Sequence, residues 1–278
     1  METVKLNNGV EMPVLGLGTF LSNDPAICEQ SVVDAIHAGY RLIDTAQGYG
    51  NEEYIGRAIT RCGVPREELF ITTKVWFKNY EDARVSVKDS MRKLQVDYLD
   101  LVLLHWPFGN TYAAWRDLEA LYSEGKIRAI GVSNYMADRL MDLVNYNKVV
   151  PAVNQIETNF VSQQTEVRHW MDKLGVRHMG YAPFGQGKMD EIYSDEVLCF
   201  IAERYGKTPR QIALRFQIQS GVVAIPKTTH IERLKENLDV FDFELLDNEM
   251  EILRGFDKGT PLIGNPQNPD LVAASVNW

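Results

Sequence analysis

The sequence predicts an α/β fold, a (β/α)8 TIM barrel, and two observations support this prediction. Eight short apolar or β-branched segments, which we expect to be strands, alternate with segments whose apolar residues recur at helical spacing. The expected strands begin at intervals of roughly 25 to 30 residues, and the longer last interval holds two expected helices. Eight parallel strands joined by helices close into a barrel of roughly 250 residues. A doubly wound open sheet is the alternative.

The individual elements follow from the same alternation. The strands are expected to begin near Val14, Arg41, Leu69, Leu99, Ile127, Ala152, Arg177 and Val222. The helices, including extra ones beyond the eight of the barrel, are expected at residues 25–37, 51–61, 80–94, 112–123, 136–146, 163–174, 195–205, 209–219, 231–238 and 247–256. Because no linker or change of composition divides the chain, we expect a single domain over residues 1–278.

Two segments lie outside the repeated unit. Residues 5–13, KLNNGVEMP, place an Asn-Gly turn between two short extended runs, which is typical of a β-hairpin. We expect this N-terminal β-hairpin to cover the N-terminal end of the barrel. Residues 258–278 are rich in Pro, Gly and Asn, so we expect an irregular tail over the surface.

Composition and charge exclude several classes of partner. The 278 residues carry a formal net charge of -9 with 45% hydrophobic residues, which is ordinary for a globular protein and disfavours nucleic acid as the main partner. No apolar run is long enough for a membrane span, and the N-terminus lacks the pattern of a secretion signal. Three widely spaced cysteines, Cys28, Cys62 and Cys199, are typical of reduced thiols. These features together predict a cytoplasmic protein.

Polar residues close three consecutive expected strands. Asp44 ends the second strand, Lys74 lies near the end of the third, and His105 ends the fourth. Tyr49 follows Asp44 in the loop before the next helix. Each residue alone could be a helix cap, a snorkelling lysine, a core histidine or a packing residue. Because barrel active sites lie at the C-terminal ends of the strands, the four together predict one catalytic pocket.

The chemistry of the four side chains is complementary. An unperturbed phenol has a pKa of about 10, and a neighbouring ammonium group lowers that pKa by favouring the phenolate. Lys74 can supply this charge, and Asp44 can hold Lys74 charged. We expect His105, oriented by its own hydrogen bonds, to position or polarise a carbonyl oxygen. The set is therefore suited to protonating an oxyanion, with Tyr49 as the general acid.

Further motifs span nearly the whole chain: DTAQGYGNEE at residues 44–53, ITTKVW at 71–76, LLHWP at 103–107, GVSN at 131–134, VNQIE at 153–157 and IPKTTHIERLKEN at 225–237. In content and order they resemble the aldo-keto reductase family. The resemblance implies the barrel fold and the tetrad Asp44, Tyr49, Lys74 and His105. It implies an oxidoreductase that reduces aldehydes or ketones to alcohols by hydride transfer from NADPH, bound without a Rossmann domain. A non-catalytic NADP(H)-binding module of the same fold is the alternative.

The resemblance also implies cofactor-binding residues. For NADPH they are Gly18, Thr19 and Asp44 at the first two strand ends, Ser133, Asn134 and Gln155 for the nicotinamide carboxamide, Tyr181 as the stacking platform, and Lys227, Thr228, Arg233, Glu236 and Asn237 after the last strand. The last group opens a helix, where backbone N–H groups and the helix dipole favour anions. Lys227 and Arg233 form the local basic cluster that an acidic chain needs for phosphates.

The chain departs from the family pattern at two places. Thr158, Asn159 and Phe160 follow VNQIE where the family commonly has His-Pro, and Ala182 stands where a serine is common. We expect the loop shape beside the pocket to differ and one hydroxyl contact to the phosphates to be lost.

The expected substrate pocket has an aromatic wall. Phe20, Trp76 and Trp106 lie at strand ends beside Tyr49 and His105, with Phe108 nearby and Trp278 able to close the mouth from the tail. An aromatic mouth with few charges suits a small, neutral carbonyl compound. No metal site is expected, because His105 is the single one of five histidines at a strand end. We expect a monomer.

Overall fold

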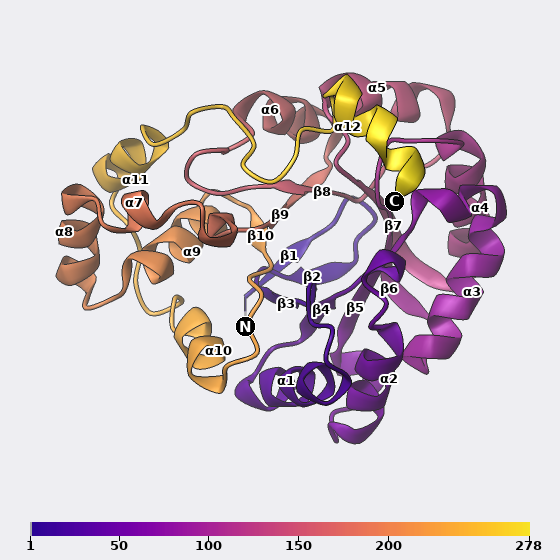
Figure 1. Ribbon diagram of the computed structural model, residues 1–278, viewed down its shortest axis with the longest axis horizontal. Helices are drawn as coiled ribbons and strands as arrows, with labels where there is room; N and C mark the ends of the chain where they lie inside the picture. The colour runs from indigo at the N-terminus through magenta and orange to yellow at the C-terminus, as the bar shows by residue number, and fades with distance from the viewer. Residues whose placement is uncertain (1) are drawn as a thin grey trace.

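The computed structural model describes residues 2–278 and shows a ring of strands surrounded by helices (Figure 1). Eight parallel strands lie side by side in chain order. They are β3 (Gly16–Gly18), β4 (Leu42–Asp44), β5 (Phe70–Val75), β6 (Leu99–Leu104), β7 (Ile127–Ser133), β8 (Val153–Glu157), β9 (Arg177–Tyr181) and β10 (Val223–Ala224). A parallel bridge between Leu15 and Ala224 closes the ring, and Gly18 N donates to Pro226 O at 3.0 Å. The predicted (β/α)8 barrel is confirmed.

Helices cover the outside of the barrel and connect successive strands (Figure 1). They are α1 (Pro25–Ala38), α2 (Glu52–Arg61), α3 (Ala83–Leu94), α4 (Thr111–Ser123), α5 (Ala137–Tyr146), α6 (Thr165–Leu174), α7 (Asp190–Tyr193), α8 (Glu196–Tyr205), α9 (Pro209–Gln219), α10 (Ile231–Leu238), α11 (Asp247–Arg254) and α12 (Pro269–Ala274). Local sequence sets their ends. The side chain of Asp24 caps α1 by accepting a hydrogen bond from Ile27 N, and Gly39 ends that helix with a φ of 116°.

Two expectations about helices were wrong. The third helix was expected from residue 80, but Phe77–Asp82 form a 3-10 helix and α3 begins at Ala83. Tyr80 explains this difference, because its buried hydroxyl donates to Trp106 O at 2.7 Å and so ties the 3-10 helix to the loop after β6. The tail, expected to be irregular, contains α12, whose start has the cap Asn268 and a proline at the first helical position.

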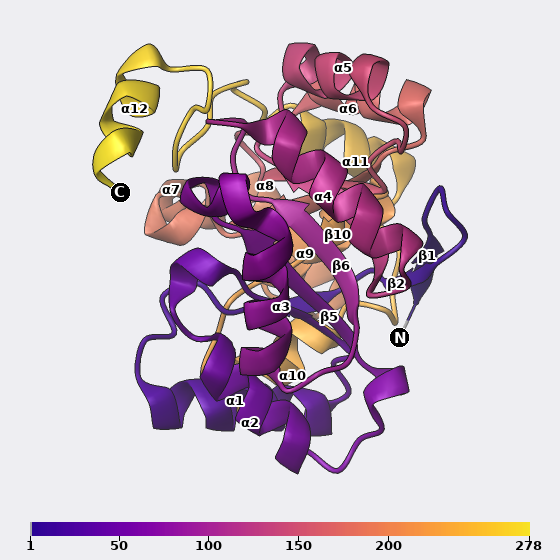
Figure 2. The ribbon, with the colours of Figure 1, turned by 90° about the vertical axis from the view of Figure 1, so that its right-hand side faces the viewer.

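The N-terminal hairpin forms as predicted, from β1 (Thr3–Lys5) and β2 (Glu11–Pro13). Leu6 and Met12 are buried and pack with Leu42 and Phe70, which begin β4 and β5. The hairpin therefore covers the N-terminal end of the barrel. Figure 2 shows it at the opposite end from α12 and the C-terminus. Each helix within residues 2–278 is too short or too polar to cross a membrane.

The position of Met12 predicts a loss of stability without a loss of activity. The Met12→Ala variant leaves a cavity in the barrel floor, and truncation of a buried methionine costs about 2–5 kcal/mol. Denaturant unfolding should show this cost. Turnover should stay near the wild-type value, because the catalytic end of such a barrel lies at the opposite face.

An exposed neighbour in the same strand serves as the control. The Glu11→Ala variant removes an exposed side chain, so its stability should change by no more than about 0.5 kcal/mol. A Met12→Ala protein as stable as the wild type, or a folded one that has lost turnover, would contradict the assignment of the hairpin to the structural end.

Candidate active site

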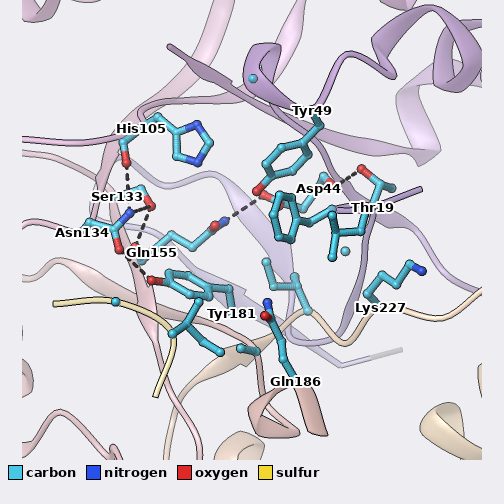
Figure 3. A pocket seen from close by; sticks show the side chains of 18 of the residues that line it. Thr19, Asp44, Tyr49, His105, Ser133, Asn134, Gln155, Tyr181, Gln186 and Lys227 are labelled. Carbon is cyan, nitrogen blue, oxygen red and sulfur yellow. Dashed lines mark hydrogen bonds between the residues drawn. The ribbon is translucent and has the colours of Figure 1, made fainter. Parts of the chain in front are cut away.

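A cavity of about 640 Å³ lies at the C-terminal ends of the barrel strands. Its lining includes these sequence-predicted residues: Gly18, Thr19, Phe20, Asp44, Tyr49, Trp76, His105, Trp106, Ser133, Asn134, Gln155, Tyr181, Lys227 and Trp278. Lys74 is fully buried behind the wall of the cavity. Most of the sequence-predicted residues are thus brought together around one space, and Figure 3 labels nine of them together with Gln186.

Lys74 joins the predicted catalytic residues. Its Nζ donates to Asp44 Oδ1 at 2.6 Å, to Thr45 O at 3.0 Å and to Tyr49 Oη at 3.2 Å. The second carboxylate oxygen of Asp44 accepts a hydrogen bond from Gln155 Nε2 at 2.8 Å. Lys74 and Asp44 are 0% and 2% exposed, so each charge is compensated inside the protein rather than by water.

The electrostatics of the buried pair favour a charged lysine. Burial acts to lower the pKa of Lys74, but the Asp44 carboxylate and the Tyr49 phenol outweigh burial and raise that pKa. Burial raises the pKa of Asp44, and Lys74 and Gln155 oppose the rise. The ammonium group is therefore held charged directly beside the Tyr49 hydroxyl.

For Tyr49 the net direction differs from the sequence-based expectation. Burial raises the pKa of its phenol, and although Lys74 acts to lower the pKa as expected, it does not overcome burial. Tyr49 therefore stays protonated at neutral pH. This protonation state is the one that a general acid requires.

His105 is neutral and is oriented by packing. Burial, together with the Lys74 charge, lowers the pKa of His105 well below its ordinary value. We expected hydrogen bonds to orient its ring, but the buried Nδ1 has no partner within residues 2–278. The ring instead makes edge contacts with Trp76 and Tyr49, at centroid distances of 5.2 and 5.7 Å. A neutral imidazole facing the cavity can donate one N–H to a carbonyl oxygen.

A short 3-10 helix, Gln47–Tyr49, carries the phenol, and sequence reasoning missed the residue that fixes it. The side-chain oxygen of Gln47 accepts hydrogen bonds from Trp76 N and Asn79 Nδ2, both at 2.9 Å, and its amide group donates to Ser90 Oγ at 3.0 Å. This amide binds the turn of Tyr49 to the loop of Trp76. Gln47 does not end a strand, and its partners come from distant parts of the chain, so no strand-end pattern in the sequence indicates its role.

Gly48 allows the indole ring of Trp76 to pack directly against the backbone. A Cβ atom at position 48 would lie 2.8 Å from Cε3 of the indole ring, closer than real Cβ contacts occur. The indole thus rests directly against the backbone of the turn that carries Tyr49.

The residues expected to hold the nicotinamide form one hydrogen-bonded cluster. Tyr181 Oη donates to Asn134 Oδ1 at 2.8 Å, and Ser133 Oγ donates to the carbonyl of Gln155 at 2.8 Å. Asn134 adopts a left-handed backbone with a φ of 64°, which asparagine tolerates better than most residues. Its side-chain amide nitrogen donates to His105 O at 3.1 Å, so the cluster is tied to the strand end that carries the candidate catalytic histidine.

This cluster fits the nicotinamide cofactor that the family resemblance implies. Gln155 Oε1 makes no hydrogen bond within residues 2–278, so it is available to a carboxamide N–H. The ring of Tyr181 lines the cavity beside it. At the other end of the cavity Lys227 is exposed and, within the described residues, forms no ion pair, so it can meet a phosphate.

The remaining predicted cofactor residues lie beyond the cavity, on the segment after β10. Arg233 is exposed on α10 and, among residues 2–278, has no ion-pair partner. Thr228 and Asn237 are buried. Glu236 accepts a hydrogen bond from the hydroxyl of Thr208, the cap of α9, at 2.7 Å. Arg233 and Lys227, like Lys235 on the same helix, therefore have no ion-pair partner within the described residues, whereas Glu236 is engaged within the protein.

The aromatic wall includes the tail. Trp278 lies 5.6 Å from Trp106 and 6.3 Å from Trp76 between ring centroids, and Phe108 stacks on Trp106 at 5.3 Å. Phe108 backs this wall without lining the cavity. Lining residues that sequence reasoning missed are Leu21, Gly48, Pro183, Phe184, Gln186, Ile225, Ile263, Gly264 and Leu271. Part of this set belongs to the tail, whose position depends on contacts distant in sequence.

The loop that departs from the family pattern is a compact turn. The side-chain oxygen of Asn159 accepts hydrogen bonds from Val161 N and Ser162 N, both at 3.2 Å. Phe160 is buried against Phe216 and Phe256 outside the cavity. Ala182 lines the cavity with a positive φ of 51° and offers no hydroxyl.

Comparisons with known proteins identify the family of the chain. The family model described as "Aldo/keto reductase family" matches residues 14–258. The chain is 44% identical to the glyoxal reductase of Bacillus subtilis over 268 residues, which are 95% of this chain and 96% of that protein. It is 38% identical over 266 residues to the methylglyoxal reductase DkgA of Escherichia coli, covering 95% of this chain and 96% of the relative.

A solved structure shows the same likeness in three dimensions. The Bombyx mori aldo-keto reductase in complex with NADP superposes with a TM-score of 0.91 at 33% identity, covering 96% of this chain and 99% of that one. Sequence and fold therefore agree, and the chain belongs to the aldo/keto reductase family.

Proposed function

We propose that the protein reduces small aldehydes and ketones to alcohols with NADPH, and that Tyr49 is the general acid. The observation that carries this proposal is the contact of one buried ammonium group, Lys74 Nζ, with both Asp44 and the hydroxyl of Tyr49. The hydroxyl faces a cavity that His105 also lines. This arrangement suits the transfer of a proton to a carbonyl oxygen that is becoming an alkoxide.

Each catalytic side chain has a separate task. His105, being neutral, donates an N–H to the substrate oxygen and sets its position. Tyr49 Oη transfers its proton to that oxygen as negative charge develops. Lys74 stabilises the resulting phenolate, and Asp44 keeps Lys74 charged and in place. A bound nicotinamide cofactor supplies the hydride for the carbonyl carbon.

The cofactor-binding residues divide between the two ends of the site. Ser133, Asn134 and Gln155 offer polar groups for the carboxamide, and Tyr181 offers its ring for stacking. Lys227 and Arg233 provide positive charge for phosphates, and Arg233 offers a planar guanidinium for the 2′-phosphate that distinguishes NADPH from NADH. The NADP complex of the Bombyx mori structure supports this choice of cofactor.

The substrate class follows from the wall of the cavity and from the relatives. The aromatic side chains around Tyr49 and His105 present few charges, which suits small neutral carbonyl compounds. The names of the relatives from Bacillus subtilis and Escherichia coli, glyoxal reductase and methylglyoxal reductase, support dicarbonyl compounds as the first substrates to test. No observation favours the non-catalytic alternative, since the four catalytic side chains are all present and adjacent.

We also propose that the protein is a cytoplasmic monomer with reduced thiols. Cys28 and Cys62 are buried, Cys199 is exposed, and all three are free. This is consistent with a reducing compartment.

The Tyr49→Phe variant tests the general acid. It keeps the aromatic ring but removes the transferable proton, so kcat should fall by about 10² to 10⁴-fold. Binding of NADPH, followed by quenching of protein fluorescence, should be retained. The matched control is Tyr54→Phe in α2, which should keep wild-type turnover. Wild-type turnover in Tyr49→Phe would eliminate Tyr49 as the acid.

The Arg233→Ala variant tests the choice of cofactor. A hydrogen bond to a charged group contributes about 1.5–3 kcal/mol, so the Kd of NADPH should rise by roughly 10 to 100-fold, with little change for NADH. Lys235→Ala, an exposed cation on the same helix, should have little effect on either cofactor. Equal losses for NADPH and NADH in the Arg233 variant would remove the 2′-phosphate assignment.

The pH dependence of reduction should show a broad plateau. Because its pKa is lowered, His105 gains a proton only well below pH 6.5, and because its pKa is raised, Tyr49 loses its proton only above about pH 10. At saturating cofactor and substrate, kcat should therefore be flat through neutral pH. Circular dichroism over the same range controls for unfolding. An inflection of kcat near pH 6.5 would show that His105 titrates normally.

A further inference from the structure

Glu157 ends β8, next to the cavity, and the residue is 3% exposed. Within residues 2–278 it has no ion-pair partner. Burying a carboxylate is costly unless hydrogen bonds compensate its charge. The catalytic scheme does not use Glu157, so its burial needs a separate explanation.

Hydrogen bonds from the tail provide that explanation. Glu157 Oε1 accepts from Leu262 N at 2.7 Å, and Oε2 accepts from Ile263 N at 2.9 Å. Asn159 Nδ2 adds a third hydrogen bond, to Oε1, at 3.1 Å. Two successive backbone N–H groups thus hold both oxygens of one carboxylate. Hydrogen bonds of this kind, with a charged acceptor, are stronger than those between neutral groups.

The tail beyond this point forms part of the pocket. Ile263, Gly264, Leu271 and Trp278 line the cavity. The hydrogen bonds described for residues 265–278 stay within that segment. Its far end rests on the barrel through the aromatic contacts of Trp278. Lys258 N donates to Val161 O at 3.0 Å where the tail begins, and Glu157 is the buried side chain that holds the tail directly before a segment held otherwise by apolar packing.

Lys188 makes a second polar contact, but it is weaker. Its Nζ donates to Leu262 O at 2.6 Å in an exposed position, where water competes for both groups.

We propose that Glu157 is a positioning residue that holds the tail as one wall of the substrate pocket. It acts on substrate binding through Ile263 and the segment that follows, and not on the proton donated by Tyr49. The inference rests on the proposed reductase function for its kinetic consequence, whereas the attachment itself can be measured without any activity.

The Glu157→Gln variant tests the attachment. Glutamine keeps one acceptor oxygen but places an NH2 group against the second backbone N–H. Hydrogen–deuterium exchange of residues 260–264 in the full chain should accelerate by about 10-fold or more, because local opening of the variant no longer has to break a charge-assisted hydrogen bond. The KM for methylglyoxal should rise by about 5 to 20-fold, since substrate meets a looser wall, while kcat stays within about threefold.

Glu249→Gln is the matched control. Glu249 is equally buried at 3% exposed, and its carboxylate accepts from Tyr205 Oη, Leu246 N and Arg204, away from the tail. This variant can lower global stability, but it should leave both the exchange of residues 260–264 and KM near their wild-type values. Equal effects of Glu249→Gln and Glu157→Gln would overturn the proposal.

A variant on the tail side covers the case in which Glu157→Gln does not fold. Ile263→Pro removes the backbone N–H that donates to Glu157 Oε2 and leaves the barrel sequence unchanged. It should raise KM by a similar factor. Where both variants fold, combining them should raise KM by much less than the product of the two single effects, because the substitutions break the same contact. Unchanged tail exchange in Glu157→Gln, or a fall in kcat at constant KM, would contradict the positioning role.

The two proposals fail in different ways. If the wild-type protein reduces no carbonyl compound, the reductase proposal fails, and the exchange measurement still decides whether Glu157 holds the tail. If reduction occurs and tail exchange does not depend on Glu157, the positioning role alone fails.

Discussion

The ion pair between Lys74 and Asp44 is the constraint on which the site depends. Both side chains are withdrawn from water, and removal of one partner from a buried pair costs about 3–5 kcal/mol. The pair persists because Thr45 O, the Tyr49 hydroxyl and Gln155 Nε2 complete its hydrogen bonds. The pair itself comes from β4 and β5, and these partners come from β8 and from the loop after β4. These hydrogen bonds form together only when the barrel is closed in its observed register.

The tetrad could be predicted from sequence because it follows a rule of position. Asp44, Lys74 and His105 lie at the ends of consecutive strands, and parallel strands in a barrel bring these ends to one face. Tyr49 could be added because its loop is short. The amide cluster and the cations after β10 followed from the family resemblance rather than from chemistry alone.

The features that escaped prediction depend on long-range contacts. Gln47 acts through Trp76 and Ser90, partners whose proximity appears only in the folded chain. The net pKa of Tyr49 depends on the balance between burial and the nearby Lys74 charge. The charge could be predicted from sequence, but the extent to which the phenol is buried could not. The tail was expected to be irregular because it is rich in Pro, Gly and Asn. Its position depends on partners far away in sequence, such as Glu157, which accepts hydrogen bonds from Leu262 N and Ile263 N about a hundred positions later in the chain.

The close contact between Gly48 and Trp76 couples the width of the pocket to the placement of the Tyr49 phenol. A larger side chain at position 48 would displace the indole, which contacts His105, Phe77 and Trp278. The same position lies within the turn that carries the general acid. Changes in pocket width and in acid placement are therefore linked. Substrate range at this wall should evolve through paired substitutions at positions 48 and 76, and libraries that vary either position alone will sample mostly misplaced acids.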